Sequence, residues 1–147
     1  MISFIQRVSS ARVEVDQQII GKIDRGLLVL VCAERQDDPF IANKMLDKIL
    51  KLRIFSDDSG KMNRSVQDVQ GGLLIVSQFT LAADCSGGNR PSFAQAAPPE
   101  LGKSLYEYFL ACAQQKHSNV QSGRFGANMQ VHLVNDGPVS IPLRIQS

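Results

Sequence analysis

A short polar segment directly follows an apolar stretch near the middle of the chain. Ser77, Gln78, Phe79 and Thr80 come after Leu73–Val76 and precede an irregular loop. Hydroxyl groups can act as nucleophiles when a base removes their proton, and backbone N–H groups at such a strand end can bind an anionic oxygen. The segment is therefore a candidate site edge. On residue types alone, the simpler interpretation is that Ser77 and Thr80 merely end a buried strand.

Cysteine and histidine offer little further chemistry. Cys85 lies in a polar, glycine-rich loop, but no adjacent residue could act as the base that a catalytic thiol needs. Cys32 and Cys112 fall in apolar patterns and are expected in the core as free thiols. His117 and His132 stand in no ligand-like cluster, so we expect both at the surface. The sequence contains no GxSxG, Walker, HExxH or CxxC motif, which disfavours metal and phosphate-loop chemistry, and we expect no cofactor.

A second unusual feature is the dipeptide Gly137-Pro138 within the turn-like sequence NDGP. An X-Pro bond adopts the cis form at small energetic cost, and glycine adds no side-chain clash. Most X-Pro bonds are nevertheless trans, and NDGP is an ordinary turn sequence. The residues by themselves therefore favour a trans bond and leave the cis form open.

The overall composition indicates one globular domain spanning residues 1–147. The chain has 44% hydrophobic and 20% charged residues, enough to form a single substantial core. A net charge of +2 permits contact with a phosphate backbone but lacks the dense basic runs of strong nonspecific nucleic-acid binders. The longest apolar run is too short to span a membrane, and the first residues do not resemble a signal peptide. We therefore expect a cytoplasmic protein.

The first half of the chain predicts strands followed by a helix. Residues 11–15 and 19–23 alternate in polarity around Gln17-Gln18, which predicts a hairpin. The continuous apolar run 27–33 predicts a central strand covered on both faces. Asp38 followed by Pro39 predicts the start of a helix that continues to about Leu52. The buried face of this helix is expected to include Ile41, Met45 and Ile49.

The second half predicts further strands and a second helix. Residues 53–55 and the run 73–82 are expected as strands, and residues 83–93 as an irregular surface loop. A helix over 99–116 is expected to bury Leu101, Leu105, Tyr108 and Cys112. A strand over 129–134, the NDGP turn and a last short edge strand containing Pro142 complete the chain. This order predicts a compact, layered α/β fold with mixed or antiparallel sheets and two main helices.

Four ordered motifs then resemble one family closely. They are SQFTLA at residues 77–82, NRPSF at 89–93, SGRFGANM at 122–129 and NDGPVS at 135–140, and the opening MISFIQRVSSARVEV matches as well. The chain resembles the D-aminoacyl-tRNA deacylases, also called the D-tyrosyl-tRNA deacylase family, over essentially its whole length. The resemblance implies an enzyme that hydrolyses the ester of D-aminoacyl-tRNA, a chiral proofreading reaction in translation quality control. It also implies a homodimer with active sites at the subunit interface.

The resemblance also implies roles for particular residues. The Ser77–Thr80 segment lines the pocket and supplies backbone donors near Phe79 and Thr80, without a covalent nucleophile, and the ribose 2'-hydroxyl of tRNA takes part. A cis Gly137-Pro138 dipeptide, held by Arg7, enters from the partner subunit and excludes L side chains. Because glycine has no side chain to exclude, glycyl-tRNA is an expected second substrate. The residues expected to bind substrate are Arg90, Phe125 and Met129.

The sequence departs from the family pattern at two places, and two other functions remain open. Ser140 stands where threonine is usual, and the loop DCSGGNRPSF lacks a lysine often found before its glycine. The lost charge is expected to change tRNA affinity and its salt dependence before stereoselectivity. One alternative function is a covalent hydrolase that uses Ser77, Thr80 or Cys85. The other is a noncatalytic RNA-binding module.

Overall fold

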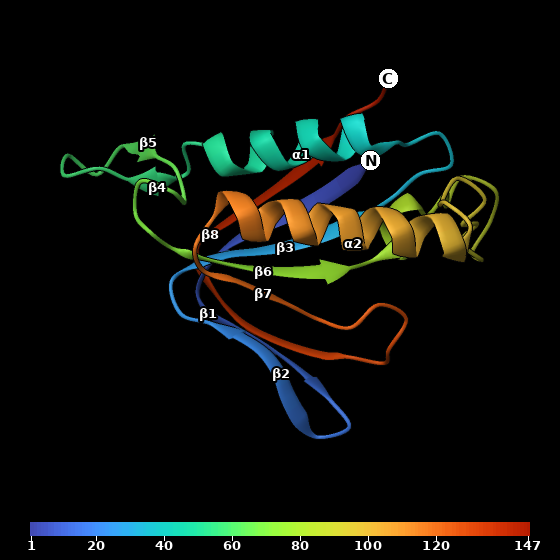
Figure 1. The fold of residues 1–147 in the computed structure, drawn as a ribbon, viewed down its shortest axis with the longest axis horizontal. Coiled ribbons are helices and arrows are strands. Elements are labelled where there is room, and N and C mark those ends of the chain that lie inside the picture. Colours follow the sequence, from blue (N-terminus) through green and yellow to red (C-terminus); the bar gives the residue numbers. More distant parts are fainter.

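Two helices cover one face of a mixed six-stranded sheet in the computed structural model, which describes residues 1–147 (Figure 1). The expected α/β class with two main helices is confirmed. The strands are β1 (Ile2–Val15), β2 (Gln18–Ile23), β3 (Gly26–Cys32), β4 (Phe55–Ser56), β5 (Met62–Arg64), β6 (Gly72–Ser77), β7 (Val120–Ser122) and β8 (Gln130–Arg144). The helices are α1 (Pro39–Lys51), the short 3-10 helix η1 (Phe79–Ala82) and α2 (Pro99–Lys116).

The sheet has the order β2-β1-β3-β6-β7, and β8 pairs with β1. The pairs β3–β6 and β6–β7 are parallel, whereas β1 runs antiparallel to β2, β3 and β8. The first half of β1 lies between β3 and β8, and its second half lies between β2 and β8. The expected hairpin is confirmed, with Ala11 opposite Ile23. The expected central strand is β3.

Strands β3 and β6 contribute side chains alternately to two cores. Leu27, Val29 and Ile75 face α1 and α2, whereas Leu28 and Leu74 face the curled ends of the sheet. All five side chains are at most 1% exposed. The coverage of β3 on both faces, expected from its continuous apolar run, is therefore confirmed.

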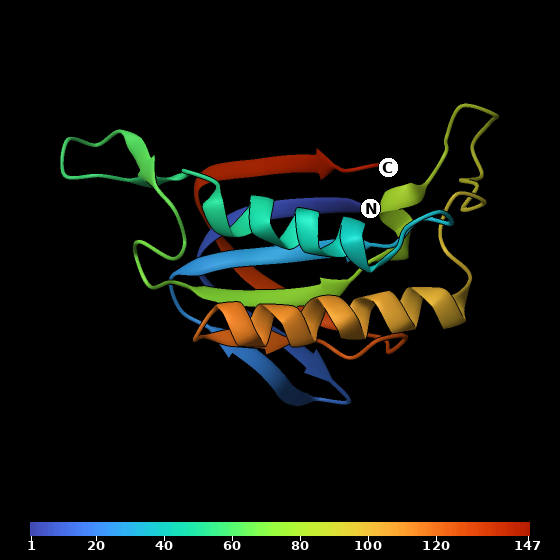
Figure 2. The same ribbon diagram turned by 45° about the horizontal axis from the view of Figure 1, so that its top comes forward.

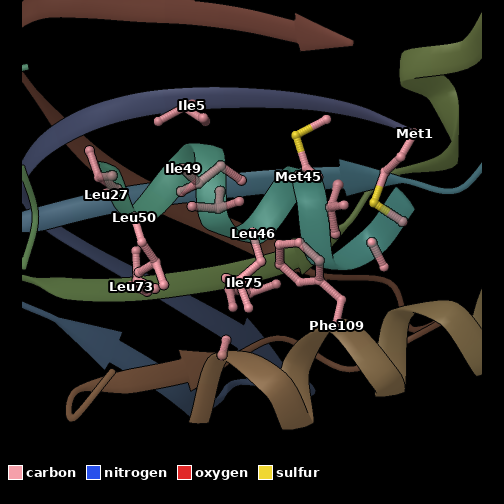
Figure 3. Packing of buried hydrophobic residues seen from close by; sticks show 14 of the residues in the cluster. Met1, Ile5, Leu27, Met45, Leu46, Ile49, Leu50, Leu73, Ile75 and Phe109 are labelled. Carbon is pink, nitrogen blue, oxygen red and sulfur yellow. The ribbon is translucent and has the colours of Figure 1, made fainter. Parts of the chain in front are cut away.

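Helix α1 begins and packs as its sequence predicts. The Asp38 side chain accepts a hydrogen bond from the Ile41 N–H at 2.9 Å, and Pro39 occupies the first turn. Figure 3 shows Met45 and Ile49 of α1 packed against the strands of the sheet, together with Phe109 of α2. These side chains are fully buried. The two helices therefore share one core with β3 and β6.

The face that α2 buries differs from the expected one. Leu105 is buried as expected, but Leu101, Tyr108 and Cys112 are only partly buried; the other buried residues of α2 are Tyr106, Phe109 and Ala113. The sequence periodicity was ambiguous because the helix carries apolar residues over a broad arc. His117, expected at the surface, is buried, and its Nε2 lies 2.6 Å from the Gly71 carbonyl oxygen. That polar contact explains why the core tolerates the imidazole.

The two expected strands around residues 53 and 73–82 are shorter than predicted. Strand β4 begins only at Phe55, and β6 ends at Ser77, so Phe79–Ala82 forms η1 instead of extended chain. The η1 turn aims the chain away from the sheet and into the loop that follows. In Figure 2, that loop and the β4–β5 hairpin project from opposite ends of the molecule. No helix is long and apolar enough to cross a membrane.

The NDGP segment is a bulge within one strand and does not separate two strands, as the sequence had suggested. Strand β8 runs along β1 from Gln130 to Arg144, with Asn135 opposite Val8 and Ser140 opposite Gln6. Residues 136–139 therefore face the single residue Arg7 and must bulge out of the sheet. Strand β8 pairs with β1 alone, which confirms the edge position expected for Pro142.

Gly26 should tolerate no side chain, because a Cβ atom there would lie 2.0 Å from the Gly72 carbonyl oxygen on the paired strand. We expect Gly26→Ala to lower the free energy of unfolding by about 1–3 kcal/mol or more, since two backbones would have to separate. Gly87→Ala is the matched control, because nothing lies within 4 Å of its Cβ position. Urea unfolding of both variants measures the difference, and equal stability would contradict the close strand approach.

Candidate active site

A cavity of about 660 Å³ opens at the carboxyl end of β3 and β6. Val31 and Ser77 are register partners at the ends of these parallel strands, so the segments that follow them diverge around the same space. Such strand ends are where α/β sheets commonly bind ligands. Of the 22 lining residues, 15 are hydrophobic, which suits an apolar or aromatic group more than a highly charged one.

Three residues of the SQFT segment line this cavity, and the fourth does not. Ser77, Gln78 and Phe79 are lining residues, whereas Thr80 is exposed beside it. The Gln78 N–H donates to the Val31 carbonyl at 2.9 Å, and its side-chain amide donates to the Thr80 hydroxyl. These bonds fix the point where the chain leaves β6. Phe79 and Thr80 then open η1, where the first N–H groups of a helical turn have no acceptor within the turn.

Aromatic side chains form two walls of the cavity. Phe79 and Phe93 meet edge to face with ring centroids 5.1 Å apart, and Tyr106 and Phe125 lie 5.9 Å apart. Phe79 is 57% exposed, which is unusual for an aromatic side chain that only fills a core. The Tyr106 hydroxyl donates to the Ile75 carbonyl at 2.9 Å, and burial raises the pKa of Tyr106 to about 12. Tyr106 is therefore a neutral structural wall.

The predicted substrate-binding residues divide into two groups. Phe125 and Met129 line the cavity, but Arg90 lies in the exposed loop and outside the lining. The basic residue that does line the cavity is Arg35, whose Nε donates to the Ala94 carbonyl. Sequence reasoning missed Arg35, although its position just after the central strand was a usable signal. It also missed Tyr106 and Phe93.

A balanced group of charges supports the same edge of the cavity. The N-terminal ammonium of Met1 lies 3.1 Å from Glu34 and 2.8 Å from Asp37, and Glu34 also pairs with Arg144. Burial by itself would raise the pKa of Glu34. Hydrogen bonds from Arg144 and from the ammonium outweigh burial and hold that pKa below its usual range. Two positive and two negative groups therefore neutralise one another here.

Gly137 and Pro138 lie at the other end of the sheet. Their peptide bond is cis, as the resemblance implied, and both residues are exposed. Arg7 holds the segment: its Nε donates to the Asp136 carbonyl at 3.0 Å and its Nη1 to the Ile54 carbonyl at 2.6 Å. Arg7 is paired with Leu27 of β3, four residues before the cavity edge at Val31, or about 13 Å along the strand. Neither Gly137 nor Pro138 lines the cavity of its own chain.

The cavity contains no pair of nucleophile and base. Its lining includes no histidine, aspartate, glutamate or lysine side chain that could activate Ser77. Cys32 lines it, but burial, together with the charge of Glu34, raises the pKa of that thiol to about 11. Cys85 is exposed and lies outside the lining. No group of three or more His, Cys, Asp or Glu residues is placed to hold a metal ion.

The thiols should therefore differ sharply in reactivity. At pH 8 we expect iodoacetamide to alkylate Cys85 quickly in the native protein and to leave Cys32 unmodified, because Cys32 is 2% exposed and remains a neutral thiol well below its pKa of about 11. Mass spectrometry of digested samples over time measures both rates. Rapid labelling of Cys32 in folded protein, with unfolded protein as the control, would contradict this assignment.

Comparisons with known proteins agree with the fold and with the sequence motifs. The chain is 64% identical over 145 residues to a protein of Paracidovorax citrulli named D-aminoacyl-tRNA deacylase, covering 99% of this chain and 94% of the relative. A relative of the same name from Methylibium petroleiphilum is 65% identical over 143 residues, covering 97% of this chain and 94% of the relative.

Two solved structures share the fold. One, titled c-Myc DNA Unwinding Element Binding Protein, superposes with a TM-score of 0.94 at 41% identity and full coverage of both chains. The other, titled a probable eukaryotic D-amino acid tRNA deacylase, gives a TM-score of 0.83 at 17% identity, covering 98% of each chain. The sequence profile of the family described as D-Tyr-tRNA(Tyr) deacylase matches residues 4–144. The chain belongs to the D-Tyr-tRNA(Tyr) deacylase family.

Proposed function

We propose that this chain hydrolyses the ester bond of D-aminoacyl-tRNA as a cytoplasmic homodimer. The observation that carries the proposal is that two parts of the expected site, the cavity and the Gly137-Pro138 segment, lie at opposite ends of the sheet. A largely apolar cavity opens at one end of the sheet, and the Gly137-Pro138 segment, held by Arg7, is exposed at the other. The names of relatives that are 64–65% identical over nearly the whole chain support the substrate.

The chemistry that fits this cavity needs no side-chain nucleophile. An aminoacyl ester is already activated, so water can attack its carbonyl carbon if the ester is held in place and the resulting oxyanion is stabilised. The N–H groups of Phe79 and Thr80 at the start of η1 are suitable donors. The C–O bond to the ribose then breaks, and the ribose oxygen leaves with a proton. The neighbouring 2'-hydroxyl of tRNA assists in place of a missing protein base.

Stereoselectivity in this proposal comes from the partner subunit. The Gly137-Pro138 segment of one chain enters the cavity of the other, and its carbonyl oxygens occupy the space that an L side chain would need. Phe125 and Met129 complete the wall of the cavity around the substrate. Selection by exclusion leaves D side chains free and cannot reject glycine, which makes glycyl-tRNA a second substrate.

A noncatalytic nucleic-acid-binding function is the second candidate. The structure titled c-Myc DNA Unwinding Element Binding Protein, with a TM-score of 0.94, is the observation that favours it. The net charge of +2 gives it little support, because tight nonspecific binding requires many phosphate contacts. Binding of tRNA without any turnover of D-aminoacyl-tRNA would favour this candidate over the hydrolase.

The substrate range is tested with one tRNA charged with a D-amino acid, the corresponding L-amino acid, or glycine. We expect enzyme-dependent release of the D-amino acid and of glycine, and a rate for the L-ester close to spontaneous hydrolysis, because only the L side chain meets the partner's carbonyl oxygens. Release of labelled amino acid over time measures all three rates. An L-ester cleaved as fast as the D-ester would contradict selection by exclusion.

Mixed dimers test whether the site is shared between subunits. Gly137→Ala disturbs the segment, because residue 137 has φ +130° and a Cβ there would lie 3.1 Å from the Arg7 side chain. Ala127→Trp fills the cavity, which Ala127 lines. We expect either homodimer to fail in D-selective hydrolysis, and a purified mixed dimer to recover about half of the wild-type activity, because one of its two sites combines both intact parts.

The double variant Gly137→Ala, Ala127→Trp, paired with a wild-type chain, is the matched control. In a shared site this mixed dimer shows no D-selective hydrolysis, because the intact cavity receives the altered segment and the intact segment enters the blocked cavity. In a site built within one chain it keeps half of the activity, and the first mixed dimer recovers none. A site shared between subunits and a site within one chain therefore predict opposite activities for the two mixed dimers.

A further inference from the structure

We propose that Arg35 binds the phosphate that joins the terminal nucleoside of the bound tRNA to the rest of the RNA. This inference rests on the proposed function and adds to it a residue that recognises the nucleotide. Arg35 is the one charged side chain among the 22 residues that line the cavity. It is also exposed, so its charge faces the cavity entrance and solvent instead of the core.

The guanidinium of Arg35 is not neutralised by its surroundings. The nearest carboxylates along the chain, Glu34 and Asp37, are already paired with the Met1 ammonium and, for Glu34, with Arg144. Arg35 itself forms no salt bridge, and its side-chain hydrogen bond to the Ala94 carbonyl uses Nε alone. Both terminal nitrogens thus remain available. Two parallel N–H donors of this kind match the oxygen spacing of a phosphate.

The backbone around Arg35 is fixed, which keeps this charge at the cavity entrance. Its N–H donates to the Gln95 carbonyl at 3.2 Å, and the Ala97 N–H donates to the Ala33 carbonyl at 2.9 Å. Glu34 and Ala96 form a bridge between the same two segments. The Nε bond to Ala94 further limits the side chain. Arg90, the basic residue of the neighbouring loop, lacks such anchoring and lies outside the cavity lining.

Of the groups in the substrate, only a phosphate is an anion that the positive charge of Arg35 could bind. The amino acid brings a positively charged ammonium, which Arg35 would repel, and the terminal nucleoside is neutral. The first anion met on leaving the cavity is the 5'-phosphate of the terminal nucleotide. A bidentate charge-assisted contact at a partly hydrated entrance is expected to favour the phosphorylated ligand by roughly tenfold. Arg35 thereby fixes how deeply the nucleotide enters.

Inhibition by nucleotides tests this role directly. Adenosine and adenosine 5'-monophosphate are compared as inhibitors of D-aminoacyl-tRNA hydrolysis by the wild type, Arg35→Gln, Arg35→Lys and the control Lys22→Gln. Lys22 is exposed on β2 and lies outside the cavity lining, so its replacement removes one charge elsewhere. We expect the wild type and the control to bind the monophosphate roughly tenfold tighter than adenosine, and Arg35→Lys to keep only part of this preference, because an ammonium cannot form the bidentate contact. Arg35→Gln should bind both equally.

The salt dependence of KM for D-aminoacyl-tRNA is the second readout. Arg35→Gln should reduce the slope of log KM against log salt by about one, and the control should leave it unchanged, because one phosphate contact is lost. Glutamine keeps an N–H donor for the Ala94 carbonyl, so Arg35→Gln should preserve the anchoring of the loop. If the variant acted only by losing that anchoring, it would weaken the binding of both inhibitors equally. That result, an unchanged salt slope, or no phosphate preference in the wild type would overturn the proposal. A wild type that leaves D-aminoacyl-tRNA intact would instead refute the proposed function.

Discussion

The parallel pairing of β3 and β6 is the contact on which the rest of the site depends. Gly26 and Gly72 bring the two backbones together at one end, and the register then carries Val31 and Ser77 to the same edge at the other. Because parallel strands end together, the segment containing Arg35 and the segment containing Phe79 leave the sheet side by side. The cavity is the space between them, covered by α2 and by the 123–129 segment.

The antiparallel partners of β3 have the opposite effect on Gly137-Pro138. Strand β1 begins at the cavity end and reaches Arg7 only at the far end of β3, and β8 follows β1 in reverse. The bulge opposite Arg7 therefore lies at the end of the sheet that is far from the cavity, although the same sheet forms the cavity's edge. A site that needs both parts must combine two copies of the chain, and an exposed segment held by a nearly buried guanidinium suits that purpose.

The sequence predicted features that depend on neighbouring residues and missed those that depend on distant pairing. The Asp38-Pro39 signal located α1, and the apolar run 27–33 located a strand covered on both faces. The bulge in β8 follows from pairing with β1, from the other end of the chain, and no local pattern encodes it. The resemblance pointed to Arg90, and the position of Arg35 just after the central strand was passed over. Only the folded loop shows that Arg35 reaches the cavity and Arg90 does not.

Selection by exclusion, as proposed for this chain, would also limit how the substrate can be bound. A cavity that accepts many D side chains, and glycine, can form few specific contacts with the amino acid, so affinity must come from the part that all substrates share. That part is the nucleotide end of tRNA, with aromatic bases and a phosphate. The exposed Phe79, the Tyr106–Phe125 wall and the unpaired charge of Arg35 are suited to those groups. Under the proposed mechanism, most of the binding energy would therefore come from the nucleotide, and the amino acid would only be selected by steric exclusion.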